Sequence, residues 1–487
     1  MSRIQLVETS FRDGQQSLWA TRMTNAMILP FLPRLDNFGF DVIDLIGGAV
    51  FDVCVRFLRE DPWERMRLAS GLMKKTPLNL WSRGQSLFTF EMFPDDIVDL
   101  TVKRVAANGI KRYTCYDTLH DIRNIALSVN TAKQCGMHAS GHVVYTISPA
   151  HTDEFYANAA REIAKLGVDS VGIKDPSGLL TPERAKTLVP AIRAVIGDLP
   201  LEMHSHCRSG LGELVCLTGI KLGVNIIHLG VRPLAASDAL PDARYCTRWM
   251  RSEGHEVLVD DADIGEMEDY LTAVALEHGK PIMPYNRYDP FLYHHQVPGG
   301  MISNLHMQLR DLNLEHKLEA VLEEAGRVRA DLGYPILVSP FAQFIITQAT
   351  INVMSQERYA SMPDEVVRYV LGYYGRPVAP IDPEVLDRID RLTGGAEPNL
   401  ARPGEVIRPR LPELRKEYSS LRSEDDLVTA SYYQPKQFDA FMNERNKGLS
   451  GISANAGLRE ALRKFEKLQP HRQVSMHHGG VRIELAR

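Results

Sequence analysis

Short runs of apolar and β-branched residues recur through the first half of the chain, separated by amphipathic stretches. Eight such runs lie at residues 4–10, 41–47, 77–83, 109–117, 138–146, 170–175, 201–207 and 225–231. Between them, segments such as EFYANAAREIAKLGV (154–168) repeat apolar residues at the 3.6-residue spacing of an α-helix. Strands that alternate with helices indicate βαβ units and a parallel sheet. Eight units within about 240 residues predict an α/β fold of the (β/α)8 TIM-barrel type.

Glycine marks the boundary between helix and strand in two of these units. IAKLGVDSVGI and IKLGVNIIHL each carry Leu-Gly directly before a strand, at Gly167 and Gly223. A glycine in this place predicts a left-handed residue that ends the helix.

The pattern changes after residue 250. LEHKLEAVLEEAGRVRADLG (314–333) predicts a long amphipathic helix that ends at glycine, and further helical segments follow to about residue 375. The Pro-rich stretch 375–413 predicts a surface connector, and HHGGVRIELAR (477–487) allows a frayed tail or one edge strand. We therefore expect a barrel over 1–300, a mainly helical C-terminal domain packing on it over 301–420, and a helical extension and tail over 421–487.

Composition narrows the class of protein. A chain of 487 residues exceeds one ordinary hydrophobic core, so two or three domains are expected. A net charge of −5 without a strongly basic segment argues against nucleic acid and anionic membranes as partners. No signal peptide or bilayer-length apolar run is present, and the six cysteines lack C-x-x-C spacing. These features predict a cytoplasmic protein with reduced thiols and no membrane insertion.

Charged and imidazole side chains gather at the C-terminal ends of the predicted strands. Five strand ends carry them: Asp13, Arg83, Asp117, Lys174 with Asp175, and His204 with His206. A single charged residue at a strand end is usually a cap or a salt bridge. Because the active site of a (β/α)8 barrel lies at the C-terminal ends of its strands, agreement among five ends favours a site.

The stretch LEMHSHCRSG places two histidines two residues apart at the end of the seventh strand. Side chains at i and i+2 share one face of a strand, so His204 and His206 could reach one ion. With Asp13 they would form a carboxylate and imidazole set suited to zinc, manganese, iron or cobalt, acting as a Lewis acid on a carbonyl oxygen. The alternative is a histidine pair satisfied by backbone or solvent.

Lys174 and Arg83 each allow more than one interpretation. A lysine in a crowded barrel mouth is paired with a carboxylate such as Asp117, is a Schiff-base nucleophile, or is a modified ligand. Arg83 is suited to clamp a substrate carboxylate, because its fork binds two oxygens at once, or it forms an internal salt bridge.

The motifs together resemble the biotin-dependent carboxyltransferase family. Its members include the carboxyltransferase part of pyruvate carboxylase, the α subunit of oxaloacetate decarboxylase and the keto-acid subunit of transcarboxylase. The resemblance is carried by RDGQQSLWATRM, GGAVFDVCVRFLREDPWERMR, RGQSL, YTISPAHT, IKDPSGLLTP, HSHC, HQVPGGMISNL, VRADLGYPILVSPFAQFIITQATINVM and LGYYGRPVAPIDPEV. DPWERMR and PGGMISN are the most specific of these, whereas R-D-G also occurs in the wider metallolyase superfamily. The segment 424–446 looks most like the transcarboxylase and oxaloacetate decarboxylase branch.

The resemblance implies a metal, zinc, manganese or cobalt, held by Asp13, His204, His206 and a carbamylated Lys174. It implies that Arg83 and Gln16 hold the oxo-acid substrate and that Ser303 moves a proton between substrate and biotin. The implied reaction transfers a carboxyl group between carboxybiotin and the enolate of a 2-oxo acid, with pyruvate and oxaloacetate the usual pair. Such an enolate needs positive charge close to its developing oxyanion.

The resemblance also bears on partners. The Ala-Met-Lys-Met segment that accepts biotin in relatives is absent, and so is an ATP-grasp biotin carboxylase portion. We therefore expect no biotinyl domain in residues 421–487. Biotin would reside on a separate carrier protein, accompanied by a biotin carboxylase subunit, and relatives lead us to expect a homodimer or larger complex.

The substrate pocket departs from the family pattern. Strand 4 reads YTCYD (113–117), where Thr114 replaces an arginine before Asp117, and the segment after strand 8 reads RPLAASDALPD (232–242). LIGG replaces Trp-Gly-Gly after strand 2, and Ser86 replaces asparagine. We predict that Thr114 and Asp117 bind the substrate. Because the pocket departs from the family pattern, the acceptor could be a different oxo acid or a thioester.

Three other functions compete with this interpretation. The first is a biotin-independent oxo-acid decarboxylase or lyase of the same barrel superfamily, and the second is a non-catalytic assembly subunit of a carboxylase complex. A metal-dependent aldolase or Claisen condensing enzyme is disfavoured by DPWERMR and PGGMISN.

Overall fold

The structure is a computed structural model of the whole chain. It describes residues 3–297, 305–306, 309–310, 313–355, 357–421, 423–454, 474–478 and 481–485. Ser303, the predicted proton shuttle, lies outside the described residues. The chain forms two compact units, Met1–Tyr432 and Tyr433–Arg487. The predicted domain limits at residues 300 and 420 stay predictions.

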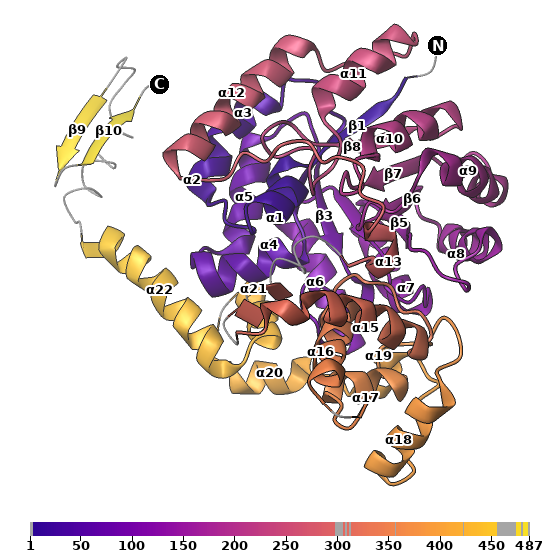
Figure 1. Ribbon diagram of the computed structural model, residues 1–487. Helices are drawn as coiled ribbons and strands as arrows, with labels where there is room; N and C mark the ends of the chain where they lie inside the picture. Colours follow the sequence, from indigo (N-terminus) through magenta and orange to yellow (C-terminus); the bar gives the residue numbers. More distant parts are fainter. Residues whose placement is uncertain are drawn as a thin grey trace. The chain divides into compact units, whose positions relative to one another are not determined.

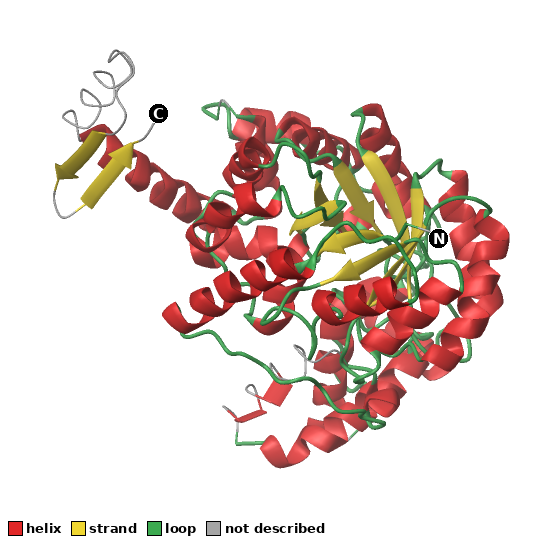
Figure 2. Cartoon of the chain, turned by 90° about the horizontal axis from the view of Figure 1, so that it is seen from above, coloured by secondary structure: helices red, strands yellow, loops and turns green. Residues whose placement is uncertain are grey.

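Eight parallel strands close into a barrel in sequence order, and the first strand pairs with the last. They are β1 Gln5–Glu8, β2 Val42–Ile46, β3 Leu78–Ser82, β4 Arg112–Cys115, β5 His138–Val144, β6 Ser170–Asp175, β7 Leu201–Ser205 and β8 Ile226–Leu229. Helices enclose this ring on the outside (Figures 1 and 2). The predicted (β/α)8 TIM barrel is confirmed, and every predicted strand contains an observed one.

The observed strands are almost entirely buried, as expected when a parallel sheet is covered on its outer face and closed on its inner face. Strand pairing sets which side chains become neighbours. Lys174 on β6 pairs with His204 on β7, so two residues 30 positions apart lie side by side at one level of the barrel.

Helices alternate with the strands around the barrel. The helices of this part are α1 Gln15–Leu18, α2 Asn25–Ile28, α3 Leu32–Leu35, α4 Gly48–Val53, α5 Pro62–Leu72, α6 Asp95–Ala107, α7 Arg123–Gln134, α8 Asp153–Lys165, α9 Pro182–Ile196, α10 Gly212–Lys221, α11 Ala243–Ser252 and α12 Asp261–Glu277. The hydroxyls of Thr152 and Thr181 cap α8 and α9. Gly167 and Gly223 adopt φ angles of +76° and +96°, which confirms the predicted glycine helix ends.

Shorter helical turns connect several of these elements. They are η1 Ser10–Gly14, η2 Leu29–Phe31, η3 Cys54–Leu58, η4 Gly84–Ser86 and η5 Glu315–Lys317. η1 follows β1 directly and therefore places Asp13 at the C-terminal end of the first strand.

A helical region follows the barrel within the first unit (Figure 1). Its helices are α13 Leu292–His295, α15 Leu318–Asp331, α16 Phe341–Met354, α17 Asp364–Val370, α18 Pro383–Thr393, α19 Pro403–Val406, α20 Leu411–Glu417 and α21 Glu424–Tyr432. The predicted helix over 314–333 is confirmed by η5 and α15. Arg329 of α15 donates to the carbonyl of Ile147 and the hydroxyl of Thr146, which fastens this region to the barrel.

The surface connector predicted over 375–413 contains α18, α19 and the start of α20, which the sequence pattern did not locate. The prolines explain the difference. Pro383 and Pro403 each occupy the first positions of a helix, where the missing N–H costs no hydrogen bond and the fixed φ suits the helix. Asp382 also caps α18 by accepting from the backbone N–H of Glu384.

The second unit contains α22 Pro435–Ala454 and the antiparallel strands β9 Val474–His478 and β10 Val481–Leu485. The tail thus holds a strand pair where the sequence allowed a frayed end or one edge strand. None of the helices that the structure describes combines the length and hydropathy that a bilayer-spanning segment requires. All six cysteines are free thiols.

Candidate active site

Asp13 is held at the barrel mouth by the tight turn η1. Its carboxylate is almost fully buried, and Gly14 packs against the segment that follows β8. A Cβ at Gly14 would lie 2.3 Å from the carbonyl oxygen of Leu234, so only glycine permits this close approach. The R-D-G sequence therefore fixes the position of the carboxylate that follows β1.

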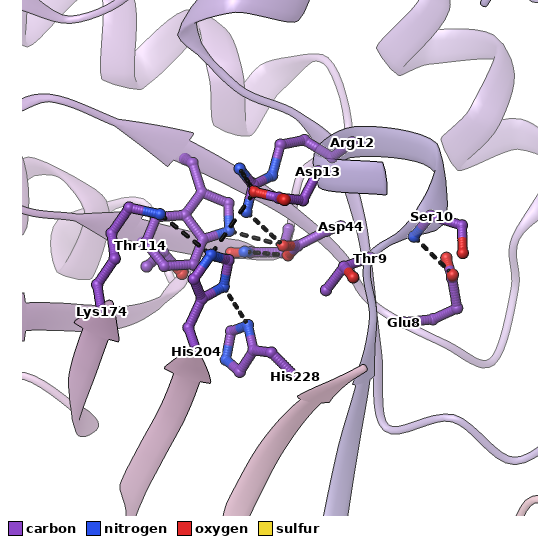
Figure 3. A network of polar contacts seen from close by, with 12 residues as sticks. Glu8, Thr9, Ser10, Arg12, Asp13, Asp44, Thr114, Lys174, His204 and His228 are labelled. Carbon is purple, nitrogen blue, oxygen red and sulfur yellow. Dashed lines mark hydrogen bonds and ion pairs between the residues drawn. The ribbon is translucent and has the colours of Figure 1, made fainter. Parts of the chain in front are cut away.

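The ends of β1, β6 and β7 bring four predicted ligands together (Asp13, Lys174 and His204 in Figure 3). Asp13 Oδ2 lies 3.6 Å from His204 Nε2, and Asp13 Oδ1 lies 3.4 Å from His206 Nε2. Lys174 Nζ lies 3.1 Å from His204 Nε2. Ligands bound at about 2.1 Å to a tetrahedral zinc ion lie about 3.4 Å apart, so the spacing of these atoms suits a metal ion.

The imidazole of His206 is oriented by the backbone. Its Nδ1 lies 2.7 Å from the carbonyl oxygen of Asp238, which can only accept a hydrogen bond. Nδ1 therefore donates to this carbonyl, and Nε2 points at Asp13. A backbone acceptor on one ring nitrogen orients the other nitrogen toward a metal site.

Asp13 is also paired with Arg12, whose Nη1 lies 2.7 Å from Oδ2. Burial alone would raise the pKa of Asp13, but the neighbouring His206 and Arg12 hold it well below its ordinary value. Arg12 Nη2 contacts Asp44 Oδ2 at 3.2 Å, so the guanidinium bridges two buried carboxylates. The mouth thus keeps an ionised carboxylate available beside the two imidazoles.

Lys174 is buried above the ring of Trp81, with Nζ 4.5 Å from the ring centroid. Burial, reinforced by the nearby Arg12, lowers its pKa to about 7. No ion pair joins Lys174 to Asp117, because the Asp117 oxygens accept instead from the backbone of Leu119 and Asp121 and from Asn124. The carboxylate-paired alternative for Lys174 is therefore not formed with Asp117.

A pocket of about 790 Å³ opens above these residues. Asp13, Lys174 and His206 form its floor, and Gln16 and Arg83 line it. Val338, Ser339 and Ala342 of the helical region close one side. The pocket is large enough for a small acid together with part of a second group.

Arg83 lines this pocket with no carboxylate among its hydrogen-bond partners in the described part of the chain. Its Nη2 donates to the backbone carbonyl of Thr89 at 2.8 Å, and its buried Nε has no partner. Burial lowers the pKa of the guanidinium. An arginine left without a counter-ion in a pocket suits an anionic ligand.

Known proteins are similar to this chain over most of its length. The family model described as "Conserved carboxylase domain" matches residues 292–482. A pyruvate carboxylase subunit of Methanocaldococcus jannaschii is 39% identical over 434 residues, which are 88% of this chain and 76% of that protein. The chain belongs to the biotin-dependent carboxyltransferase family.

Other members of this carboxyltransferase family carry different names. The methylmalonyl-CoA carboxyltransferase 5S subunit of Propionibacterium freudenreichii subsp. shermanii is 32% identical and covers 92% of this chain and 89% of its own length. The 2-oxoglutarate carboxylase large subunit of Hydrogenobacter thermophilus is also 32% identical, covering 92% of this chain and 69% of its own. These two relatives are equally similar to this carboxyltransferase, although their names give different substrates.

A solved structure shares the fold of this carboxyltransferase. The carboxyl transferase domain of Rhizobium etli pyruvate carboxylase, described with pyruvate, gives a TM-score of 0.84 at 26% identity. The match covers 92% of this chain and 77% of that one. The barrel and the helical region after it are therefore common to both proteins.

Thr114 and Asp117, the two other predicted substrate residues of this carboxyltransferase, do not line the described pocket. The hydroxyl of Thr114 donates to Asn79 Oδ1 at 2.9 Å, and Asn79 Nδ2 donates to Asp44 at 2.6 Å (Thr114 and Asp44 in Figure 3). Burial, with a contribution from Asp121, raises the pKa of Asp117 to about 7. Both side chains are bound within the framework, and their role in substrate binding stays a prediction.

Sequence reasoning missed three residues that shape the mouth of this carboxyltransferase. Arg12 and Asp44 form the charged bridge to Asp13, and Trp81 donates its indole N–H to Asp44 at 2.7 Å. Asp44 carried a signal, because it is a charged residue inside the apolar run VIDLI. Arg12 and Trp81 carried none beyond their closeness to Asp13 and Arg83 in the sequence.

Proposed function

We propose that this chain transfers a carboxyl group between carboxybiotin, carried by a separate protein, and the enolate of a 2-oxo acid. The observation that carries the proposal is the meeting of Asp13, Lys174, His204 and His206, of which all but the fully buried His204 line a pocket that also contains Arg83. The relatives named as pyruvate carboxylase subunits make pyruvate and oxaloacetate the first substrates to test.

The donor set fits a divalent metal, with zinc, manganese or cobalt as candidates. Asp13 offers carboxylate oxygens, and His204 and His206 offer imidazole nitrogens whose atoms lie within 4.8 Å of one another and of Asp13. When bound, such an ion would supply Lewis acidity to the carbonyl oxygen of the substrate. Lys174 would complete the set as a carbamate.

The environment of Lys174 supports the proposed carbamylation. A pKa lowered to about 7 leaves much of the amine neutral at physiological pH. The neutral nitrogen attacks carbon dioxide, a nitrogen–carbon bond forms, and one proton leaves to solvent. The product carries a negative oxygen donor in place of a cation, which suits a position 3.1 Å from His204.

The chain's own residues would bind and orient the acid. Arg83 would hold its carboxylate through two parallel N–H donors, since the described structure gives it no carboxylate partner. The exposed amide of Gln16 would contact the substrate from the opposite wall. The loop that carries Val338 and Ser339 would limit water access, and Ser303 remains the predicted proton shuttle.

We propose further that biotin carrier and biotin carboxylase subunits accompany the chain, which would work as a homodimer or larger complex in the cytoplasm. The archaeal relatives support such an arrangement, because they are named as single subunits of a pyruvate carboxylase. Co-purification from the native cell followed by mass spectrometry tests it. Recovery of the chain with no biotinylated protein would contradict the partner proposal.

The test of the reaction is oxaloacetate decarboxylation by the purified, metal-loaded chain, with and without its biotinylated carrier. We expect turnover that requires the carrier and stops on addition of avidin. Turnover that avidin leaves unchanged would support a biotin-independent decarboxylase or lyase instead. A chain without bound metal and without turnover would support an assembly subunit.

The acceptor is tested in the forward direction with pyruvate, 2-oxoglutarate and acyl-CoA thioesters side by side. We expect a 2-oxo acid to be carboxylated, because Arg83 is placed for a free carboxylate. Thioesters lack that carboxylate on the reacting segment, so faster transfer to a thioester would overturn the proposed substrate class while leaving carboxyl transfer itself intact.

A further inference from the structure

A second cluster of two histidines and a carboxylate lies deeper in the barrel. His142 of β5, Glu202 of β7 and His228 of β8 are fully buried. The ring of Trp81 lies 4.7 Å from the ring of His142 and 5.9 Å from that of His228, so it separates the cluster from the pocket above. The proposed reaction makes no use of these residues.

The cluster has the composition of a metal site, but its carboxylate and both ring nitrogens of His228 are already paired. Glu202 Oε2 lies 2.9 Å from His228 Nε2, and Oε1 accepts from Arg112, Ser140 and Ser170. His142 Nε2 lies 3.0 Å from the hydroxyl of Ser140. The guanidinium beside the carboxylate would repel a cation, so hydrogen bonding describes this cluster better than metal binding.

The paired atoms continue upward to the predicted metal ligand His204. His228 Nδ1 lies 3.2 Å from His204 Nδ1, which joins Glu202, His228 and His204 in one row (His228 and His204 in Figure 3). Glu202 accepts three donors on its other oxygen, so it acts as an acceptor toward His228 as well.

In this row of residues, the position of the proton on one side chain sets the position of the proton on the next. Because Glu202 accepts, His228 Nε2 carries the proton, and in the neutral ring His228 Nδ1 then holds a lone pair. The bond between the two Nδ1 atoms then requires His204 Nδ1 to donate. His204 Nε2 is left with its lone pair facing Asp13 and Lys174, 3.6 Å and 3.1 Å away.

We infer that Glu202 and His228 are positioning residues that fix the tautomer of His204 and aim its Nε2 at the metal site. The inference rests on the proposed metal-dependent function. A single backbone carbonyl orients the ring of His206, whereas the ring of His204 is oriented by two side chains, His228 and Glu202. Outer partners of metal-binding histidines typically change metal affinity by about 10- to 100-fold.

The decisive variant is Glu202→Gln. Its amide oxygen can still accept from Arg112 and the serines, which turns the NH2 group toward His228. His228 Nε2 must then accept, Nδ1 must donate, and His204 is driven to carry its proton on Nε2. We expect zinc and cobalt affinity, measured by titration calorimetry, to fall about 10- to 100-fold.

Two further variants separate this role from a general effect on folding. His142→Gln changes a neighbour of Glu202, 3.6 Å from Oε2, that bonds to neither His228 nor His204, and we expect metal affinity within about 3-fold of the wild type. His228→Phe removes the ring that links Glu202 to His204. Adding Glu202→Gln to His228→Phe should therefore cause no further loss of metal affinity. Thermal unfolding checks that all variants fold.

The tautomer itself is read without metal. Histidine labelled with ¹⁵N reports which ring nitrogen of His204 carries the proton, and we expect Nδ1 in the wild type and Nε2 in Glu202→Gln. Unchanged affinity in Glu202→Gln, equal losses in His142→Gln, or two metal ions per chain would overturn the inference. A wild type that binds no metal but shows the Nδ1 proton would refute the proposed metal site and leave the row intact.

Discussion

The barrel holds two clusters of the same composition at two depths. The upper cluster, Asp13, His204 and His206, and the lower cluster, His142, Glu202 and His228, each combine one carboxylate with two imidazoles. All six side chains are buried. Residue type and burial therefore do not distinguish a reaction site from its support.

Partners and access distinguish them. Asp13 and His206 line the pocket, and the neighbouring Lys174 has no carboxylate paired with it among the described residues. In the lower cluster, Glu202 is surrounded by donors, and none of the three residues lines the pocket. Atoms that face the pocket and can still form a hydrogen bond or bind a metal are available to a ligand. Atoms whose hydrogen bonds are all formed hold neighbouring side chains in position.

The largest effect expected from this comparison is loss of the upper carboxylate. Asp13→Ala should remove the metal and lower kcat/KM about 1,000-fold, because metal activation supplies several kcal/mol and each ~1.4 kcal/mol is tenfold. Metal content by mass spectrometry and the carrier-dependent assay measure both. Asp198→Asn, an exposed aspartate before β7, is the matched control and should match the wild type. Full activity of Asp13→Ala would remove the distinction between the clusters.

A third buried carboxyl tests the importance of partners through pH. Glu8 accepts from the backbone N–H of Ser10 at 2.6 Å, and its Oε2 has no partner. Burial raises its pKa to about 8 from the ordinary 4.5. The folded state therefore holds an extra proton between these values, and this stabilisation is lost as pH rises toward 8.

The measurement is urea unfolding of the wild type and Glu8→Gln at pH 5.5 and pH 8. Each pH unit in this window changes the free energy of unfolding by about 1.4 kcal/mol, so the wild type should lose about 3 kcal/mol more than the variant. Glutamine resembles the protonated acid and should be close to the wild type at pH 5.5. Parallel behaviour of the two proteins would show that burial without partners does not control this carboxyl.

Much of this arrangement could be predicted from the sequence. The eight apolar runs predicted the barrel. The polar residues at the ends of these runs predicted that one end of the barrel carries Asp13, Lys174, His204 and His206. Glu202 could have been found as well, because it alternates with His204 and His206 in LEMHSH and shares their face. The depth at which each side chain enters depends on the register between strands, such as Lys174 beside His204, which one sequence does not specify.

Other features depend on contacts between distant segments. Arg12 bridges Asp13 and Asp44 across β1 and β2, and neither charge reveals the other in the sequence. The helices within 375–413 were not located from the Pro-rich pattern, although proline at the first positions of a helix favours initiation.

The next largest effect is expected at Arg83, which lines the pocket. This residue tests whether a side chain that faces the pocket binds the oxo acid. Arg83→Gln should raise the KM for the oxo acid about 10- to 100-fold, since a charged hydrogen bond contributes about 1.5–3 kcal/mol. Because Arg83 does not contact the metal residues in the described structure, metal content should be unchanged. Arg161→Gln on the exposed face of α8 is the control. An unchanged KM would show that a buried cation without a counter-ion does not suffice to bind the acid.

The smallest effect is expected at Thr114, which belongs to the saturated region although the sequence suggested substrate binding. Thr114→Val keeps the shape of the side chain and removes the hydroxyl that donates to Asn79. Asn79 Oδ1 would lose its partner, so the free energy of unfolding should fall by about 1 kcal/mol, measured in urea. KM for each oxo acid should stay within about 2-fold, because the side chain does not line the described pocket. A KM change that differs between pyruvate and 2-oxoglutarate would instead show that Thr114 takes part in substrate binding. The distinction between residues that line the pocket and residues below it would then fail.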